Sequence, residues 1–336
     1  MFFNKLLLGL TSFRSPLLQG IVPCVAAAFG CQIAAGIPSI LFGTERFFDF
    51  SGSVTFLAVG ALSLYLPALR SRAAAAVNGV APDKLPALPS LTQMISSVGR
   101  LGAEQGAGAR DWRQVAATAL VLIWATRLGS YLLSRITDHG TDSRFDKIRH
   151  RPARFSFTFF MQALWVSFQM MPVLALNAVP SATLAASKVS PTTAIGLGLW
   201  GAGFIFEVGA DMQKSRWLRE KRDKVHDQEF LTGGFFNLCR YPNYFGEITM
   251  WTGLATTAAG ILAQRPVQFA LGLSGGVPGI ALTSAISFLS PAFISFLLLK
   301  VSGIPLSEPK YDKKFGHRKD YQEWRNNTPR LIPKFW

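Results

Sequence analysis

Seven long apolar blocks constrain the fold of this chain more than any other feature. A helix needs about 20 mostly apolar residues to cross the hydrocarbon core of a bilayer. Backbone polar groups in lipid must pair within the protein, and none of the blocks alternates as a membrane β-barrel strand does. The sequence therefore predicts an all-α, polytopic membrane helical bundle of about seven transmembrane helices with a basic C-terminal tail. The blocks are 19–42, 52–69, 115–135, 156–178, 189–209, 243–264 and 279–302.

Two segments between the blocks bear on the domain organisation. Segment 266–278 is apolar but interrupted by three glycines and a proline, so it fits either a re-entrant turn or half of an eighth span. Segment 71–112 is the longest hydrophilic connection and is predicted to be a loop insertion. We therefore expect an N-terminal region, 1–112, that holds the first spans and the insertion, followed by a membrane domain over 113–336.

The charge of the chain is strongly basic, with a formal net charge of +15 although only 16% of the residues are charged. Basic loops facing anionic lipid headgroups explain this better than nucleic acid, because no soluble basic domain is present. The positive-inside rule places 136–154, 210–242 and the tail from Pro305 on one side of the membrane. It places the basic insertion 71–112 on the other side. Either the span near 115–135 is wrongly predicted or a partner holds the insertion.

The cysteines and histidines predict neither a disulfide framework nor a metal site. Their spacing matches no zinc pattern, and no two histidines stand at helical spacing. These residues are Cys24, Cys31, Cys239, His139, His150, His226 and His317.

The N-terminal residues carry Lys5 and Arg14 and no acid before Glu45. This pattern resembles an organellar targeting region or the basic flank of a first span. We therefore expect a multi-pass protein of the mitochondrial inner membrane or the endoplasmic reticulum, with the first span serving as the address.

The most informative motif is Arg240-Tyr241-Pro242-Asn243-Tyr244-Phe245-Gly246-Glu247, which opens an apolar block. Pro242 suits the first turn of a helix, where its missing N–H costs nothing. Asn243 and Glu247 stand four apart and share one helical face. An ionised Glu in lipid is costly, so Glu247 indicates a functional site.

The segment 210–224 continues the preceding span out of the membrane. Asp211, Ser215 and Arg219 form one stripe, with Arg216 and Arg222 beside it. The stripe fits either a juxtamembrane helix that contacts membrane lipids or an anion site, because arginines bind phosphates in a bidentate manner.

Two glycines after this segment predict a turn that brings the stripe close to the Asn243 and Glu247 face. Gly233-Gly234 end the helix and return the chain to the membrane at Arg240. In the tail, Tyr321 and Trp324 fit either a lid that folds back or an interfacial aromatic anchor.

A glycine pattern in the fifth block is best explained by helix contacts. The run from Gly196 to Gly201 matches G-x-G-x-x-G, but it lacks the strand that a dinucleotide-binding turn requires. Small residues at helix–helix contacts explain it better.

These motifs together resemble the DUF1295 branch of the steroid 5α-reductase-like superfamily. Typical members carry S-R-H-P-N-Y-F-G-E where this chain has Cys239 to Glu247. Further elements that resemble the family are Thr44–Ser53, Trp124–Gly129, Asp142 with Arg144, Ser302–Pro305 and Thr328–Pro333. The resemblance covers most of the chain outside 71–112.

The resemblance implies a cofactor, NADPH, and a set of residues that bind it. Related methyltransferases tend to have Ser at the position of Asn243 and an apolar or aromatic residue at that of Glu247, so this chain leans towards the reductases. The implied cofactor-binding residues are Asp211, Arg216, Arg219, Arg240, Asn243, Tyr244, Glu247 and Tyr311.

One position departs from the family pattern. Tyr241 replaces the usual His after Arg240, which places any role of that His in binding or proton transfer in doubt. The catalytic residues are not identifiable from sequence, although Glu45 and Tyr65 are candidate proton donors.

Three functions agree with these patterns. The first is a membrane-embedded, NADPH-dependent oxidoreductase of lipid metabolism that reduces a lipid or steroid-like enone. The second is a reductase-like fold used as an accessory subunit of a larger membrane complex. The Tyr241 substitution and the insertion 71–112 favour this second function. The third is a membrane methyltransferase. The partners expected are membrane lipids, a lipid-like substrate or other subunits, and no nucleic acid.

Overall fold

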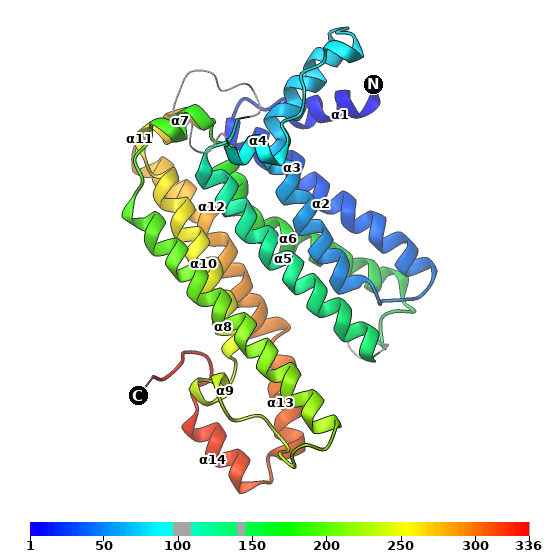
Figure 1. Cartoon of the computed structure of the whole chain (residues 1–336). Coiled ribbons are helices and arrows are strands. Elements are labelled where there is room, and N and C mark those ends of the chain that lie inside the picture. Colours follow the sequence, from blue (N-terminus) through cyan, green and yellow to red (C-terminus); the bar gives the residue numbers. More distant parts are fainter. Residues whose placement is uncertain (97–108, 140–144, 336) are drawn as a thin grey trace. The chain divides into compact units, whose positions relative to one another are not determined.

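The computed structural model describes residues 1–96, 109–139 and 145–335, and these residues form helices and no strand (Figure 1). The predicted all-α fold is thus confirmed. The long helices are α2 (Pro16–Leu41), α3 (Phe48–Val77), α5 (Trp112–His139), α6 (Pro152–Asn177), α8 (Pro191–Arg222), α10 (Pro242–Leu262) and α12 (Val277–Phe296). The shorter elements are α1 (Phe2–Leu10), η1 (Pro82–Lys84), α4 (Leu91–Ser96), α7 (Ser181–Ala186), α9 (Phe235–Leu238), α11 (Arg265–Ala270), a π-helical turn (Leu297–Val301), α13 (Ile304–Phe315) and α14 (Lys319–Asn327).

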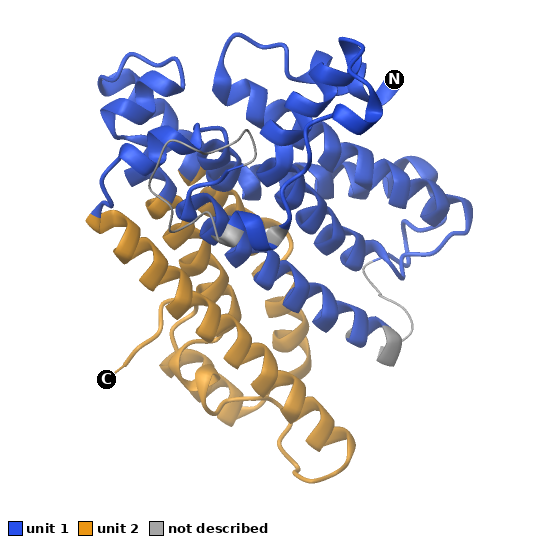
Figure 2. Cartoon of the chain, turned by 45° about the horizontal axis from the view of Figure 1, so that its top comes forward, with its two compact units in different colours: residues 1–190, 258–287 blue, residues 191–257, 288–336 orange. Residues whose placement is uncertain are grey.

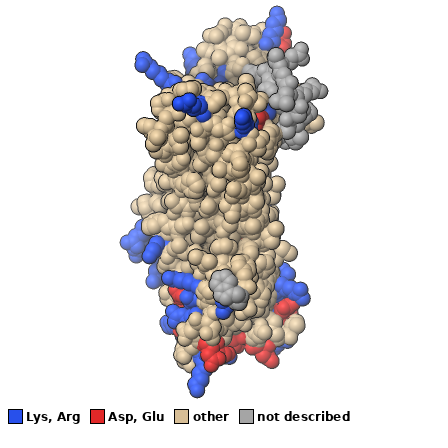
Figure 3. Space-filling model, turned by 90° about the vertical axis from the view of Figure 1, so that its left-hand side faces the viewer, with Lys and Arg blue, Asp and Glu red and all other residues tan. Residues whose placement is uncertain are grey.

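Within the described residues, six helical runs are long and apolar enough to cross a membrane, which supports the multi-pass prediction. They are α2, α3, α5, α6, α8 and the run from Val277 to Phe315. The sixth predicted block, 243–264, forms α10, which is not among the six helical runs, since Asn243, Glu247 and several threonines lower its hydropathy. Figure 3 shows broad surface areas whose described residues carry no charge, as expected for helices that face lipid.

Segment 266–278 is not half of an eighth span. It forms the single short helix α11 and then turns at Gly272 and Gly275, whose φ angles are +73° and +72°. Only glycine adopts such φ angles without strain. Gln268 anchors the turn, because its buried amide donates to Leu262 O at 2.5 Å and to Thr283 Oγ1 at 3.1 Å.

The chain divides into two compact units (Figure 2). Unit 1 comprises residues 1–190 and 258–287, and unit 2 comprises 191–257 and 288–336. The chain passes from one unit to the other between Ser190 and Pro191, at the start of α8, and again inside α10 and inside α12. The sequence-based division into an N-terminal region, 1–112, and a reductase-like membrane domain, 113–336, is a different division and stays a prediction.

In unit 1, helices α2, α3, α5 and α6 form an antiparallel bundle (Figure 1). Small residues allow close approach: a Cβ on Gly20 would lie 2.8 Å from Ala178 Cβ, and one on Gly129 would lie 2.8 Å from Ser53 Cβ. Between the helices, Phe56 meets the rings of Trp124 and Trp165 edge to face, at centroid distances of 5.1 and 5.0 Å. Such pairs are favourable beyond the area they bury.

The predicted loop insertion 71–112 is partly helical, which corrects the sequence prediction. Helix α3 continues to Val77 because Ala73 to Ala76 are strong helix formers. Helices η1 and α4 follow, and residues 97–108 lie outside the described part of the chain.

The bundle decides one of the two alternatives raised by the basic insertion 71–112, namely whether the span near 115–135 is wrongly predicted. Block 115–135 lies within α5, so the span is present, and the antiparallel order puts the described residues of 71–112 at the opposite end of unit 1 from those of 136–154. Two cations of the insertion bond to the protein itself. Arg72 donates to Pro86 O at 2.9 Å, and Arg110 is buried among backbone carbonyls. They are therefore poor indicators of which side faces anionic headgroups.

In unit 2, glycines bring the backbones of α8 and α10 into contact. A Cβ on Gly203 would lie 2.4 Å from Met250 N, and one on Gly196 would lie 2.4 Å from Gly253 O. The helix-contact explanation of the G-x-G-x-x-G pattern therefore holds for Gly196. It does not hold for Gly198 and Gly201, which have no atom within 4 Å of an added Cβ.

Candidate cofactor site

The turn between α8 and α9 is fastened by one glutamine. The side chain of Gln213 donates to Gly233 O at 2.8 Å and accepts from Phe235 N at 3.0 Å. Gly234 has a φ of +59°, and a Cβ there would lie 2.4 Å from the Gln213 amide. Gly234 is thus required by both conformation and space, whereas Gly233 has no atom within 4 Å of an added Cβ. The turn returns the chain towards α10.

The start of α10 meets the end of α8 through polar side chains. Asn243 Nδ2 donates to Asp211 Oδ1 at 3.4 Å, and Asp211 is only 8% exposed. The predicted proximity of the Asp211 stripe and the Asn243 face is therefore present in the structure. Glu247 is half-buried one turn further along α10.

A second intramembrane carboxylate, Glu207, was not singled out from the sequence. It is 3% exposed and stands one turn before Asp211 on the same buried face of α8. A Cβ on Gly246 would lie 2.4 Å from Glu207 N, so the two helices touch at this level. The sequence feature that identifies Glu207 is its position inside the apolar block 189–209, where an ionised acid is costly.

A small cavity, here called the cofactor cavity, lies beside this polar face. It measures about 90 Å³. Four of the eight predicted cofactor-binding residues line it: Arg240, Asn243, Tyr244 and Tyr311. The rest of its wall is largely aromatic and includes Trp217, Phe236, Tyr321 and Trp324.

The C-terminal tail folds back over the cofactor cavity, in agreement with the lid alternative. Trp324 Nε1 donates to Phe236 O at 3.2 Å. Arg240 N donates to Pro329 O at 2.8 Å, and Lys334 N donates to Leu238 O at 3.0 Å. The tail is thereby fixed to the segment that precedes α10.

Arg240 is held by an acid from the tail. Its Nη1 lies 2.7 Å from Glu308 Oε1, and the second oxygen of Glu308 lies 2.6 Å from Arg330 Nη2. The Nε of Arg240 is buried without a hydrogen-bond partner. A ligand acceptor at this cavity could pair with that group.

The predicted phosphate-binding arginines do not line the cavity. Arg216 and Arg219 are exposed on α8, and Arg216 pairs with Glu220 at 2.7 Å. The helical stripe is present, but the side chains point to solvent.

Tyr241, at the position where the family has His, is a half-buried phenol that stacks on Tyr244 at a centroid distance of 5.5 Å. Burial raises its pKa from 10.0 to about 12, with a smaller contribution from the negative charge of Glu308. Burial likewise raises the pKa of the neighbouring Cys239 thiol to about 11. Both groups are therefore neutral at physiological pH and supply no titrating acid or base there.

The remaining candidates lie elsewhere. Glu45 and Tyr65 belong to unit 1, where Glu45 is buried and lies 3.2 Å from Arg149. Asp142 and Arg144 fall outside the described residues. The part of the chain that the structure describes holds no cluster of three metal-binding side chains, and Cys24, Cys31 and Cys239 are free thiols.

The polar groups at this site suit a nicotinamide dinucleotide, whereas the volume of the cavity is too small for one. An amide, a carboxylate and an arginine with a spare donor match the carboxamide, ribose and phosphate groups. A ligand pocket generally measures about 300–1,000 Å³. The cavity of about 90 Å³ therefore accommodates only part of a dinucleotide unless its aromatic wall moves.

Comparison with known proteins identifies one family. The model of a family described as a protein of unknown function (DUF1295) matches residues 90–274 and 275–328. Searches of curated proteins and of solved structures gave no match.

Proposed function

Because this chain belongs to the DUF1295 family, we propose that it is a membrane-embedded reductase that uses NADPH to reduce the conjugated double bond of a lipid or steroid-like enone. The proposal draws on the resemblance of the segment Cys239 to Glu247 to the reductase signature. It also draws on the position of that segment beside the end of α8, a helix long and apolar enough to cross a membrane.

The observation that carries the proposal is the hydrogen bond between Asp211 and Asn243 beside a cavity that Arg240 lines. In this proposal Asn243, Asp211 and Glu247 bind the ribose and carboxamide. Arg240 binds the phosphates from the cavity wall, and the exposed side chains of Arg216 and Arg219 turn towards the phosphates when the cofactor binds. NADPH, when bound, supplies the hydride.

The aromatic wall would exclude water from the reacting atoms. Trp217 from α8 and Trp324 from the tail stand on this wall, and a whole dinucleotide needs more space than the cavity of about 90 Å³ offers. Closure over the ligand would then strengthen every polar contact inside the site.

A second function, an accessory subunit of a membrane complex, is favoured by the small volume of the cavity and by the pairing of Arg240 with Glu308. In that case the polar face would hold α8, α10 and the tail together and bind no cofactor. Fold alone does not decide between the two. For either function we propose the mitochondrial inner membrane or the endoplasmic reticulum as the location.

Energy transfer from tryptophan to NADPH tests the proposal on the detergent-purified full chain, with Trp217 as a donor in the cavity wall. We expect saturable transfer that is lost in Glu247→Gln and weakened in Arg219→Ala. The matched control is Arg222→Ala, which removes a cation from the same helix end but not from the predicted set. Absence of transfer in folded protein refutes the reductase proposal and favours the accessory subunit.

A further inference from the structure

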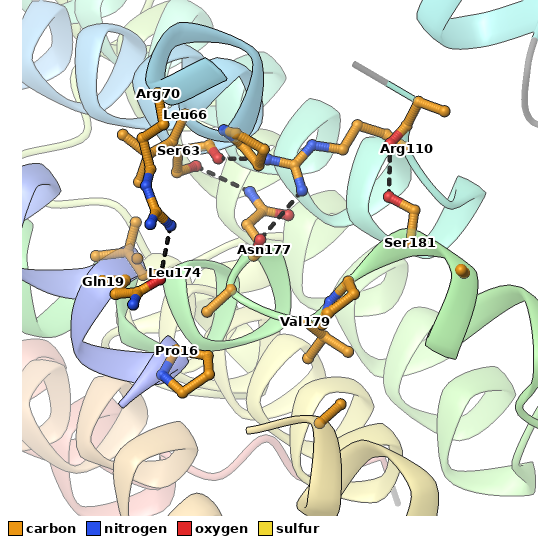
Figure 4. Close-up of a pocket in the computed structure, with 17 residues that line it drawn as sticks. Pro16, Gln19, Ser63, Leu66, Arg70, Arg110, Leu174, Asn177, Val179 and Ser181 are labelled. Atoms are coloured by element: carbon orange, nitrogen blue, oxygen red, sulfur yellow. Dashed lines mark hydrogen bonds between the residues drawn. The ribbon is translucent and has the colours of Figure 1, made fainter. Parts of the chain in front are cut away.

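Unit 1 contains a larger cavity, here called the arginine cavity, which the cofactor proposal does not use. It measures about 460 Å³ and lies at one end of the bundle, among the start of α2, the later part of α3 and the end of α6 (Figure 4). Its volume falls within the range of about 300–1,000 Å³ typical of ligand pockets. Apolar residues such as Leu66, Leu174 and Val179 form much of its lining.

The charged groups of the arginine cavity are all cationic. Arg70 and Arg110 line it, and none of the described lining residues is acidic. Arg110 is only 3% exposed and pairs with no described carboxylate. Burial lowers its pKa to about 10, so the guanidinium keeps its charge at neutral pH. A buried charge without a counter-ion is costly, and an anion in the cavity would relieve that cost.

A structural role accounts for three of the five N–H groups of Arg110. Its Nε donates to Leu64 O at 2.6 Å, its Nη1 to Asn177 O at 3.1 Å and its Nη2 to Ser63 O at 2.9 Å. Ser63 O needs this donor because Pro67, four residues later in α3, has no N–H to offer. The structural role does not account for the other two N–H groups of Arg110 or for its positive charge.

Two further groups point to a ligand. Asn177 Oδ1 is buried without a donor, although Asn177 Nδ2 donates to Ser63 Oγ and Thr118 Oγ1 at 2.9 and 3.0 Å. In the part of the chain that the structure describes, Arg70 bonds a neutral partner, donating to Gln19 Oε1 at 2.7 Å. Figure 4 shows Gln19, Arg70, Arg110 and Asn177 around the same space. Among the described residues, the cavity thus combines two cations with the unpaired acceptor Asn177 Oδ1.

We propose that the arginine cavity binds the phosphate of an anionic phospholipid whose headgroup carries a hydroxyl group. The arginines bind the phosphate oxygens, as guanidinium groups commonly do. The headgroup hydroxyl donates to Asn177 Oδ1, and the apolar lining contacts the glycerol backbone and the first part of the acyl chains. The ends of membrane-spanning helices lie at headgroup level, where such a lipid is available. This site lies in unit 1 and is independent of the proposed reductase activity.

Native mass spectrometry of the detergent-purified full chain measures this binding directly. The probes are phosphatidylglycerol, which carries a phosphate and hydroxyls, phosphatidylcholine, which is zwitterionic, and inorganic phosphate. The test variants are Arg70→Gln and Asn177→Asp, which places a negative charge in the cavity. The matched control is Arg72→Gln, because Arg72 stands two residues after Arg70 and does not line the cavity. Thermal unfolding identifies variants that remain folded.

The expected result is a preference for phosphatidylglycerol that falls at least about tenfold in both test variants, since a hydrogen bond to a charged group contributes this much. The Arg72→Gln control should bind as the parent chain does. Equal binding of phosphatidylglycerol and phosphatidylcholine overturns the proposal, as does unchanged binding in both folded test variants. Inorganic phosphate that binds as tightly as the lipid overturns the assignment of a lipid as occupant.

Discussion

Replacing Gly203 by alanine should separate helices α8 and α10 and disturb the candidate cofactor site. An added Cβ would lie 2.4 Å from Met250 N, 2.5 Å from Gly246 O and 2.9 Å from Met250 Cα. All three are backbone atoms, so no side chain can rotate away. An ordinary contact begins at 3.4 Å, so the two backbones must move apart by about 1 Å (3.4 − 2.4 Å).

The cost follows from that displacement. Overpacking of a close helix contact costs about 1–3 kcal/mol. Alanine offsets about 1 kcal/mol of this through its higher helix propensity. We therefore expect a net loss of up to about 2 kcal/mol in the free energy of unfolding. The hydrogen bond between Asn243 and Asp211, already 3.4 Å long, should break when the helices separate.

The matched control is Gly198→Ala on the same helix, where an added Cβ has no neighbour within 4 Å. That variant should be neutral or more stable by up to about 1 kcal/mol. SDS-induced unfolding in detergent micelles measures both free energies, and NADPH energy transfer measures the site. Equal stability of the two variants would refute the glycine-contact explanation.

Two further predictions concern Arg110 and Tyr241. Arg110→Gln should lower the free energy of unfolding by about 2–4 kcal/mol, because glutamine cannot donate to all three buried carbonyls. Arg72→Gln should change it by less than about 0.5 kcal/mol, because the hydrogen bond that half-buried Arg72 donates to Pro86 O is exposed to solvent. Burial raises the pKa of Tyr241 from 10.0 to about 12, so the folded chain keeps the phenolic proton while the unfolded chain releases it. The stability should therefore fall as the pH rises from 10 towards 12, and alkaline melting curves of Tyr241→Phe should show a smaller fall; identical slopes would contradict the assignment.

The sequence was most informative where a pattern depends on one helix alone. Block length and hydropathy predicted the helices, and the spacing of Asn243 and Glu247 predicted a shared face. The return of the chain at Gly233-Gly234 predicted that Asn243 would lie near Asp211, and these two side chains form a hydrogen bond. Each of these inferences needs only helix geometry and chain connectivity.

Inferences that depend on a side chain's neighbours were less complete. The arginines of α8 share a stripe with Asp211, but a stripe is wide enough that Asp211 is buried while Arg219 is exposed. The division into two units inside α10 and α12 also leaves no mark in composition, because the helices continue unbroken through it.

The basic insertion shows why counting cations can mislead in a membrane protein. Arg110 contributes to the positive charge of 71–112, but its guanidinium bonds backbone carbonyls that the helix ladders leave unpaired. One of these carbonyls, Ser63 O, is free because Pro67 interrupts α3. In lipid such a group must be satisfied from within the protein, and an arginine reaches it from another segment. The proline and the arginine, 43 residues apart (110 − 67), therefore form one structural unit, and only cations outside such pairings report which side of the membrane a loop occupies.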